Sequence, residues 1–178
     1  MFIEQALAAA AQLASDKTAP LRVEGLAVRQ ALVPPSEGRL RLQTHVERAA
    51  GGRRRVTMHS APSDEATPRF VDHAEATVVD VLNDEQIALS ERDGFDYRVI
   101  QSLDKAGFYQ QVAARGLEYG QAFRVLDDLR RSAYDATATL SPSKSVTAEL
   151  SRYRLHPAIG DALLQTIAGA LPLEADGS

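Results

Sequence analysis

The residues with the clearest chemical potential lie in one stretch, residues 153–165, which reads YRLHPAIGDALLQ. Pro157 suits the first turn of a helix, because that position needs no backbone N–H and proline already has a helical φ. In such a helix Asp161 and Gln165, four residues apart, would be neighbours on one side. A carboxyl group in an apolar helix is costly to bury without a partner or a task. The stretch therefore predicts a candidate proton donor, Asp161, backed by the amide of Gln165.

The elements that must position this stretch can be read from the hydrophobic pattern. Residues 1–14 are apolar on nearly all sides, which predicts a helix wrapped by other structure. Gly51 and Gly52 indicate a hairpin turn, and Gly25 a bulge. Residues 105–115 form a second predicted helix, ended by Gly116, with Phe108, Tyr109 and Val112 facing inward, and Ile159, Leu163 and Ile167 predict an apolar stripe on the last helix. The predicted strands are 21–32, 40–46, 53–60, 73–82, 123–130 and 133–140.

Size and composition set the outer bounds. The 178 residues are enough for one domain or two small halves with a real core. There is no cysteine, so disulfides and thiolate metal sites are excluded. The net charge of -4 gives no support to nucleic-acid binding. No apolar run has membrane-spanning length and no signal peptide is recognisable, so we expect a cytoplasmic protein without membrane association.

Two motifs resemble those of a known family. HPAIGDALLQ resembles the second active-site motif of polyketide synthase dehydratase domains, in which His-Pro opens a helix that carries Asp and, four residues later, Gln or His. The run GLEYGQAF at 116–123 is similar to the Gly-x-x-Tyr-Gly-Pro-x-Phe run of the same domains. Gln121 stands where the family usually has proline, a change that leaves Tyr119 in place. Both motifs occur in family order, which is more specific than either alone.

The resemblance implies an α+β fold of the double-hotdog type, in which each of two antiparallel sheets wraps a helix. Periodicity alone predicts only an α+β domain. We expect a partial N-terminal hotdog at 1–82, a connector at 83–102 and a partial C-terminal hotdog at 103–178. The chain is expected to be a fragment truncated at both ends, without the family's first motif and its last strands.

The family's reaction, as the resemblance implies it, removes water from a β-hydroxyacyl chain on the phosphopantetheine arm of an acyl carrier protein. A histidine takes the α-proton, and Asp161 would protonate the departing β-hydroxyl. Gln165 would hold the acid or the hydroxyl, Tyr119 would help to bind the hydroxyl, and His156 would join them while chiefly ordering the start of the helix. No cofactor is expected beyond the phosphopantetheine of the carrier. A structural role for Asp161, as a capping or salt-bridged residue, would be favoured without the two motifs.

The family's catalytic histidine is missing. Its motif, His-x-x-x-Gly-x-x-x-x-Pro, has no full match in the sequence. His45, His59, His73 and His156 are expected to have structural or surface roles, because none lies in a motif that indicates a base. We therefore expect a base encoded outside these residues or lost.

Three functions remain open at this point. The first is a dehydratase segment, which would be part of a hydro-lyase. The second is a non-catalytic remnant that binds an acyl carrier protein or dimerises. The third is a cyclising relative, either a pyran-forming or a product-template domain. Expected partners are an acyl carrier protein and neighbouring polyketide synthase domains. Incomplete sheets expose strand edges and apolar helix surface, so we also expect a homodimer.

Overall fold

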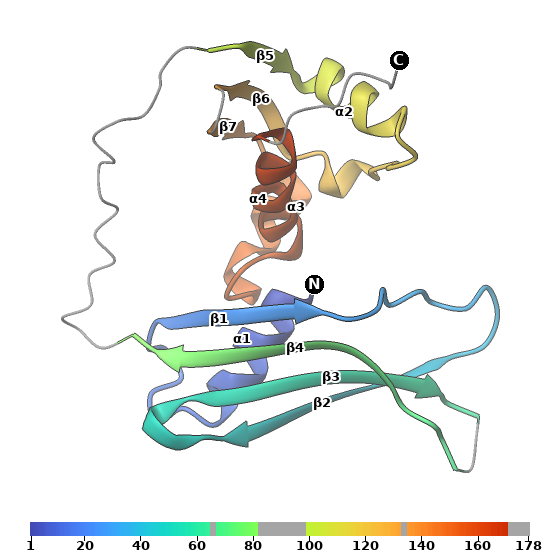
Figure 1. The fold of residues 1–178 in the computed structure, drawn as a ribbon, viewed down its shortest axis with the longest axis vertical. Coiled ribbons are helices and arrows are strands. Elements are labelled where there is room, and N and C mark those ends of the chain that lie inside the picture. The colour runs from blue at the N-terminus through green and yellow to red at the C-terminus, as the bar shows by residue number, and fades with distance from the viewer. Residues whose placement is uncertain (65–66, 82–98, 133–134, 171–178) are drawn as a thin grey trace. The chain divides into compact units, whose positions relative to one another are not determined.

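The computed structural model describes residues 1–64, 67–81, 99–132 and 135–170. The chain divides into two compact units, Met1–Gln86 and Ile87–Ser178, and each contains an antiparallel sheet and at least one helix packed on it (Figure 1). This is the predicted α+β class. Most of the predicted connector 83–102 lies outside the described residues, but its last two residues belong to a strand, which corrects that end of it.

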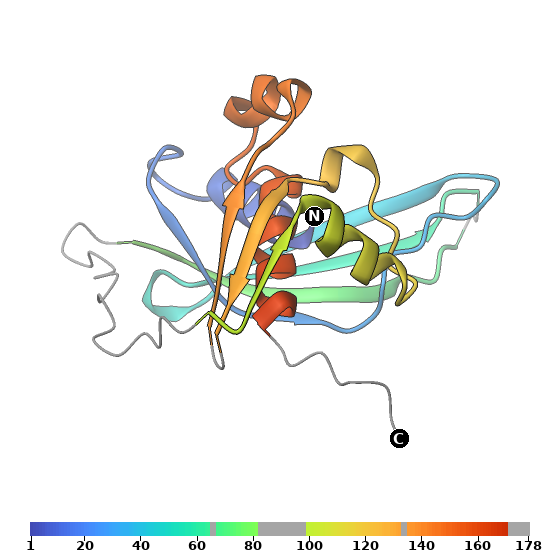
Figure 2. The same cartoon turned by 90° about the horizontal axis from the view of Figure 1, so that it is seen from above.

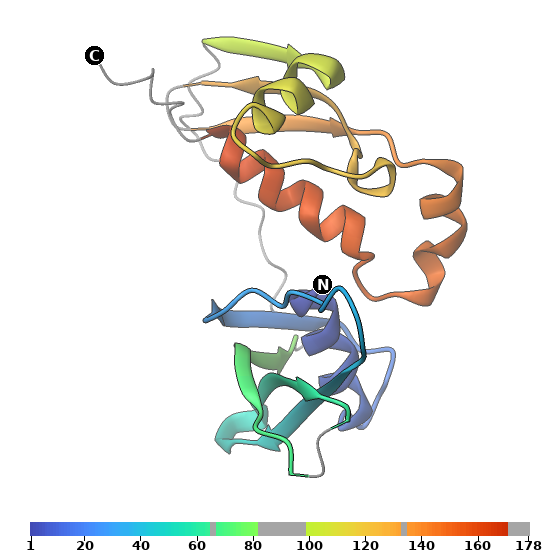
Figure 3. The same cartoon turned by 90° about the vertical axis from the view of Figure 1, so that its right-hand side faces the viewer.

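The first unit is a four-stranded antiparallel sheet with one helix on a face. The helix contacts all four strands, and Figure 3 shows it lying against the sheet. The strand order is β1-β4-β3-β2, so the first strand pairs with the last. The elements are α1 (Phe2–Gln12), β1 (Leu21–Val28), β2 (Leu40–Arg48), β3 (Arg54–Pro62) and β4 (Val71–Asp80).

The predicted helix and four strands of this unit are confirmed, and so is the bulge. The pairing of β1 with β4 shifts register between Glu24 and Ala27, and Gly25 between them has a positive φ of 63°. Glycine adopts this left-handed conformation without steric strain. The helix buries small and branched residues against the inner side of the sheet, which keeps the two layers close. The core of this unit consists of Ala6, Leu7, Ala10, Ala11, Val56, Met58, Ala61, Ala74, Ala76, Val78 and Val79.

The second unit is a three-stranded antiparallel sheet in the order β5-β6-β7 (Figure 2). Two of its elements were not predicted, the short strand β5 and the short helix α3. The strand expected from residue 123 begins at Leu126, because Gln121–Phe123 forms a 3₁₀ turn first. The elements are β5 (Gln101–Asp104), α2 (Lys105–Ala113), β6 (Leu126–Arg131), β7 (Ala136–Leu140), α3 (Lys144–Glu149) and α4 (Pro157–Ala170).

Helices α2 and α4 cover the same face of this sheet. Leu129 of β6 packs in a buried cluster with Phe108 and Tyr109 of α2. A Cβ atom added to Gly169 of α4 would lie only 2.7 Å from Cδ1 of the same Leu129. A second buried cluster joins α4 to the residue just before β6 and to α3. It consists of Val125, Val146, Ala158 and Ala162.

Helix α4 packs through its small residues. Ala158, Ala162 and Gly169 are buried, whereas Leu163 is 51% exposed and Ile167 is 61% exposed. The expected apolar stripe was therefore wrong for Leu163 and Ile167, whereas Ile159 packs partly buried against the core. The physical reason is that small side chains let the helix backbone approach the sheet closely, and the large side chains then lie on the opposite side.

Candidate active site

The centre of the candidate site is a pair on α4. Asp161 lies one turn into the helix and is half-buried, and Gln165 is only 3% exposed. Nε2 of Gln165 donates a hydrogen bond to Oδ2 of Asp161 at 2.7 Å. The helix thus brings the two side chains together as their spacing predicted. The amide thus holds one carboxyl oxygen, Oδ2, and the other oxygen, Oδ1, takes no part in this hydrogen bond.

Tyr109 of α2 holds the far end of the amide. Its hydroxyl donates to Oε1 of Gln165 at 3.0 Å and accepts the backbone N–H of Leu126 at 3.1 Å. Nε2 of Gln165 also donates to the carbonyl oxygen of Phe123 at 3.2 Å. A flipped amide would place Oε1 against that carbonyl and against the carboxylate of Asp161, which is repulsive. The surroundings therefore settle the amide orientation.

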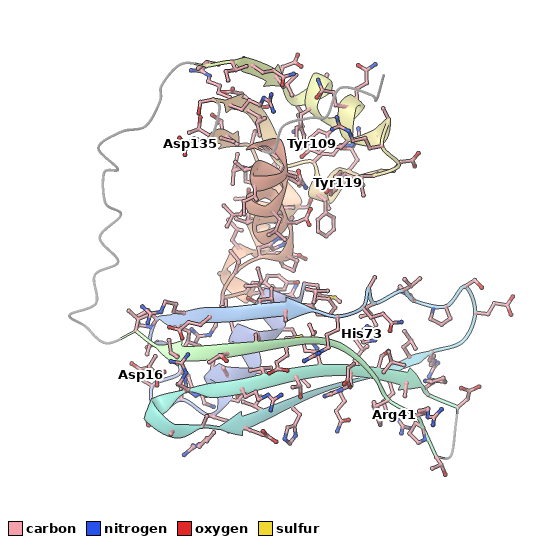
Figure 4. The ribbon with its side chains drawn as sticks, viewed as in Figure 1. Asp16, Arg41, His73, Tyr109, Tyr119 and Asp135 are labelled. Atoms are coloured by element: carbon pink, nitrogen blue, oxygen red, sulfur yellow. The ribbon has the colours of Figure 1, made fainter. Side chains whose placement is uncertain are left out.

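Tyr119 stands beside this network. Its half-buried ring meets the ring of Tyr109 edge to face, with centroids 5.9 Å apart, and Figure 4 shows the two side chains close together. Burial raises the pKa of Tyr119, and the negative charge of Asp161 raises it further. Burial is also the main reason that the pKa of Tyr109 is raised. Both phenols are therefore neutral hydrogen-bond donors at neutral pH, within electrostatic range of the candidate acid.

Arg124 fixes the loop that carries Tyr119. Its Nε donates to the backbone carbonyl oxygen of Tyr119 at 2.9 Å, and its guanidinium carbon lies 5.5 Å from the ring centroid of Tyr109. The loop forms its 3₁₀ turn with Gln121 at the position where proline was expected. The substitution therefore leaves a defined turn and keeps Tyr119 beside the acid.

His156 orders the start of α4. Its Nδ1 accepts the backbone N–H of Ala158 at 3.2 Å, which satisfies one of the free donors at the helix start. Nε2 lies 3.8 Å from a carboxylate oxygen of Glu149, and the ring packs edge-on against Tyr153. These contacts give His156 a structural task. Its contribution to substrate binding stays a prediction.

The other three histidines lie in the first unit and are engaged there. His73 is buried, with Nε2 2.7 Å from Oγ of Ser60 and Nδ1 3.2 Å from the carbonyl oxygen of Gln30. His59 contacts the carboxylate of Asp72 at 2.7 Å and the hydroxyl of Thr57 at 2.9 Å. His45 is exposed and lies 3.0 Å from a carboxylate oxygen of Glu47. These contacts are those of structural and surface residues.

Tyr109 is the site residue that sequence reasoning missed. It was expected only to face inward from its helix, yet its hydroxyl joins α2 to α4 across 56 positions of the chain. A signal was present, because a buried tyrosine needs a partner for its hydroxyl where phenylalanine would need none.

Neither a metal centre nor a membrane-spanning helix is found within the described ranges. Among those residues, no group of three or more His, Cys, Asp or Glu side chains is placed to hold a metal ion. Over the same part of the chain, no helix combines the length and the apolar character needed to cross a membrane.

Two family models match the chain, and both describe the same kind of domain. Residues 1–61 match the polyketide synthase dehydratase domain, and residues 97–178 match the polyketide synthase dehydratase N-terminal domain. Together they include the first helix, the Tyr119 loop and the whole Asp161 stretch. The chain belongs to the polyketide synthase dehydratase family.

Components of modular polyketide synthases are among its relatives. The chain is 32% identical over 177 residues to the spectinabilin polyketide synthase system protein NorA of Streptomyces orinoci, and the match covers 98% of this chain and 9% of that protein. It is 29% identical over 172 residues to the pikromycin polyketide synthase component PikAII of Streptomyces venezuelae, with 95% and 4% covered. The chain thus spans less than a tenth of the length of these relatives.

Solved dehydratase domains share the fold. The dehydratase domain from the CurF module of curacin polyketide synthase superposes with a TM-score of 0.82 at 24% identity, covering 98% of this chain and 61% of that chain. The bifunctional dehydratase-cyclase domain in ambruticin biosynthesis gives a TM-score of 0.68 at 27% identity, covering 96% and 58%. The predicted double-hotdog fold is confirmed.

Proposed function

We propose that this chain supplies the acid side of a β-hydroxyacyl thioester dehydratase site. One observation carries the proposal. Asp161 is half-buried on a helix whose next turn presents Gln165, and a buried tyrosine holds that amide in one orientation. This arrangement supports a carboxyl group with one oxygen fixed and one oxygen available for proton transfer.

In the proposed reaction a base removes the α-proton of a β-hydroxyacyl thioester. The electron pair forms the α,β double bond, the bond from the β-carbon to oxygen breaks, and Asp161 gives its proton to the departing hydroxyl, which leaves as water. Gln165 holds Oδ2, so the proton resides on Oδ1. The neutral phenol of Tyr119 donates a hydrogen bond to the β-hydroxyl. A histidine of the family's first motif, which this sequence lacks, would be the base.

The proposal includes the setting in which the site works. The β-hydroxyacyl group is carried on the phosphopantetheine of an acyl carrier protein, beside other polyketide synthase domains in the cytoplasm. The reaction is an elimination assisted by proton transfers, with no electron transfer to or from the substrate, so the proposal includes no redox cofactor and no metal. A homodimer is also part of the proposal, supported by the exposure of Leu163, Leu164 and Ile167 on α4. Light scattering of the purified chain tests that point, and a monomer would contradict it.

A cyclising activity is the second candidate function. The observation that favours it is the likeness to the ambruticin dehydratase-cyclase domain, at 27% identity and a TM-score of 0.68. A hydroxyl of the same acyl chain would then add to the enoyl product. Product analysis by NMR separates the two functions, because the cyclised product is an isomer of the enoyl thioester that has a ring in place of the α,β double bond.

The test uses β-hydroxyacyl thioester turnover by the full protein that carries this chain. Asp161→Asn keeps an acceptor for Gln165 but removes the acid, so we expect at least about a hundredfold loss of enoyl formation. Asp127→Asn, at an exposed position of the same unit, is the matched control and should retain full activity. Undiminished turnover by Asp161→Asn would refute the proposal.

A further inference from the structure

A cavity of about 560 Å³ lies beside the candidate active site in the second unit. Its lining includes Lys105, Tyr109, Gln110, Gln121 and Arg124, and two alanines complete it. Tyr109 belongs to both places, because it is one of the lining residues and its hydroxyl binds Gln165. The cavity and the Asp161–Gln165 pair therefore share one residue, Tyr109.

The charge of this cavity is one-sided. Lys105 and Arg124 are its charged lining residues, both are cations, and no carboxylate is part of the lining. In the part of the chain that the structure describes, neither cation forms an ion pair with Asp or Glu. The carboxylate of Asp104 is outside the lining and caps α2, where it accepts the backbone N–H of Gly107 at 2.8 Å. Such a lining favours an anionic ligand.

Arg124 is also held in place for this task. Its Nε is occupied by the carbonyl oxygen of Tyr119, and its guanidinium packs over the ring of Tyr109. Within the described residues, its two terminal amino groups have no hydrogen-bond acceptor. A planar guanidinium with two such groups matches the oxygens of a phosphate better than a mobile cation does.

Gln121 adds a neutral hydrogen-bond donor to the lining. It lines the cavity and stands where the family usually has proline. A glutamine amide can donate two hydrogen bonds, whereas proline offers no side-chain donor. Gln110 of α2 is also part of the lining, so two cations and two neutral donors line one space.

We propose that this cavity binds the phosphodiester of the phosphopantetheine arm, with Arg124 and Lys105 as its charged ligands and Gln121 as a neutral donor. The inference rests on the proposed function, because that function requires the acyl group to arrive on such an arm. Phosphate is the anion of the arm, and the rest of the arm is neutral. An anchor for the phosphate next to Tyr109 would direct the thioester end toward the acid that Tyr109 supports.

The experiment is a calorimetric titration of the 178-residue chain with two probes. One is the methyl phosphodiester of phosphopantetheine, which carries the single negative charge of the protein-linked arm. The other is pantetheine, which lacks the phosphate. We expect the phosphodiester to bind at least about tenfold more tightly, as charge-assisted hydrogen bonds require. Equal affinity for both probes would overturn the inference.

Variants locate the site. Arg124→Gln and Lys105→Gln should each remove most of the preference for the phosphodiester, and Arg124→Lys should retain part of it. Lys144→Gln changes an exposed lysine of the same unit outside the cavity, and it should bind as the unchanged chain does. Circular dichroism confirms that each variant is folded. A folded Arg124→Gln variant that keeps the full preference would contradict the assignment.

Two further probes exclude other anions. Inorganic phosphate that binds as tightly as the phosphodiester would show a general anion site and overturn the assignment to the arm. A carrier protein without its arm that loses binding to Arg124→Gln, while the phosphodiester preference stays unchanged, would assign the cations to an acidic protein surface instead. Either outcome would contradict binding of the phosphodiester by Arg124 and Lys105.

Failure of this inference is separable from failure of the proposed function. Binding of the phosphodiester does not require turnover, so it can be measured whatever the catalytic outcome. A phosphodiester preference together with full activity of Asp161→Asn would support the phosphate subsite and refute the dehydratase role. Loss of activity in Asp161→Asn with no effect of Arg124→Gln on binding would refute the subsite alone.

Discussion

The hydroxyl of Tyr109 lies 3.0 Å from Oε1 of Gln165 and determines, with the carbonyl oxygen of Phe123, which end of the amide faces Asp161. The amide nitrogen is the end that meets the carboxylate. The candidate acid Asp161 on α4 is thus positioned from a different helix, α2. Loss of one hydroxyl group on α2 would weaken the support of a carboxyl group that it never touches.

Removing that hydroxyl should lower stability. In Tyr109→Phe the buried N–H of Leu126 loses its acceptor and Gln165 loses a donor, so we expect the free energy of unfolding to fall by about 1–3 kcal/mol. Urea denaturation measures the change. Tyr119→Phe is the matched control, because the Tyr119 hydroxyl has no hydrogen bond within the described ranges, and it should change stability by less than about 0.5 kcal/mol. Equal losses in the two variants would contradict this view of the network.

Tyrosine ionisation should report the charge of Asp161. The pKa of Tyr119 is raised by burial and then by that charge, so Asp161→Asn should lower the pKa of this phenol. NMR titration of labelled tyrosine follows it. An unchanged midpoint would show that Asp161 and Tyr119 do not interact.

The same shift links stability to alkaline pH. A phenol whose folded pKa is raised contributes stability that is fully present below its unfolded value of about 10 and is lost as the pH rises through the folded value. Tyr119→Phe removes this group, so its stability should decline less steeply above about pH 10 than that of the unchanged chain. Urea denaturation across that range makes the comparison, and identical slopes would count against the shift.

The first unit contains an ion pair with unequal burial. Both terminal nitrogens of Arg54 bind the carboxylate of Asp80, at 2.9 and 2.8 Å, and the side chains are 7% and 37% exposed respectively. Asp80→Ala leaves a buried guanidinium without its partner and should destabilise the unit by about 3–5 kcal/mol. Arg54→Met keeps the apolar volume and leaves Asp80 partly hydrated, so it should destabilise less. Thermal unfolding compares the two, and the reverse order would contradict this expectation.

Gly169 tests the close contact of α4 with the sheet. An added Cβ would lie 2.7 and 2.9 Å from the two terminal carbons of Leu129, which is 1% exposed and has little room to move. We expect Gly169→Ala to destabilise by about 1–3 kcal/mol from overpacking, although alanine favours helices. Combining it with Leu129→Val should relieve most of the strain. A stabilised single variant would show that the helix does not sit this close.

Sequence reasoning succeeded where a relationship is local. Asp161 and Gln165 meet because one turn of helix separates them, and the bulge at Gly25 follows from a glycine within an alternating strand. The family resemblance then supplied what periodicity could not, namely that two such sheets form one double-hotdog fold.

It failed where contacts alone decide the outcome. The bond from Tyr109 to Gln165 joins residues 56 positions apart, and no spacing rule encodes it. Strand β5 has four residues, too few to show alternation, and it exists because it pairs with β6. On α4 the small residues Ala158 and Ala162 are buried, as close packing requires, but hydrophobicity wrongly favoured Leu163 and Ile167, which are exposed.

The small residues along the buried side of α4 also act as spacers that set how far Asp161 stands from the sheet. Each added methyl group on Ala158 or Ala162 would push the helix axis outward and carry the carboxyl oxygen with it. Proton transfer tolerates only small errors in distance, so in the proposed function the reach of Asp161 is adjustable through Ala158 and Ala162. Volume changes along this buried side of α4 are therefore a route to moving the candidate acid of the proposed dehydratase site.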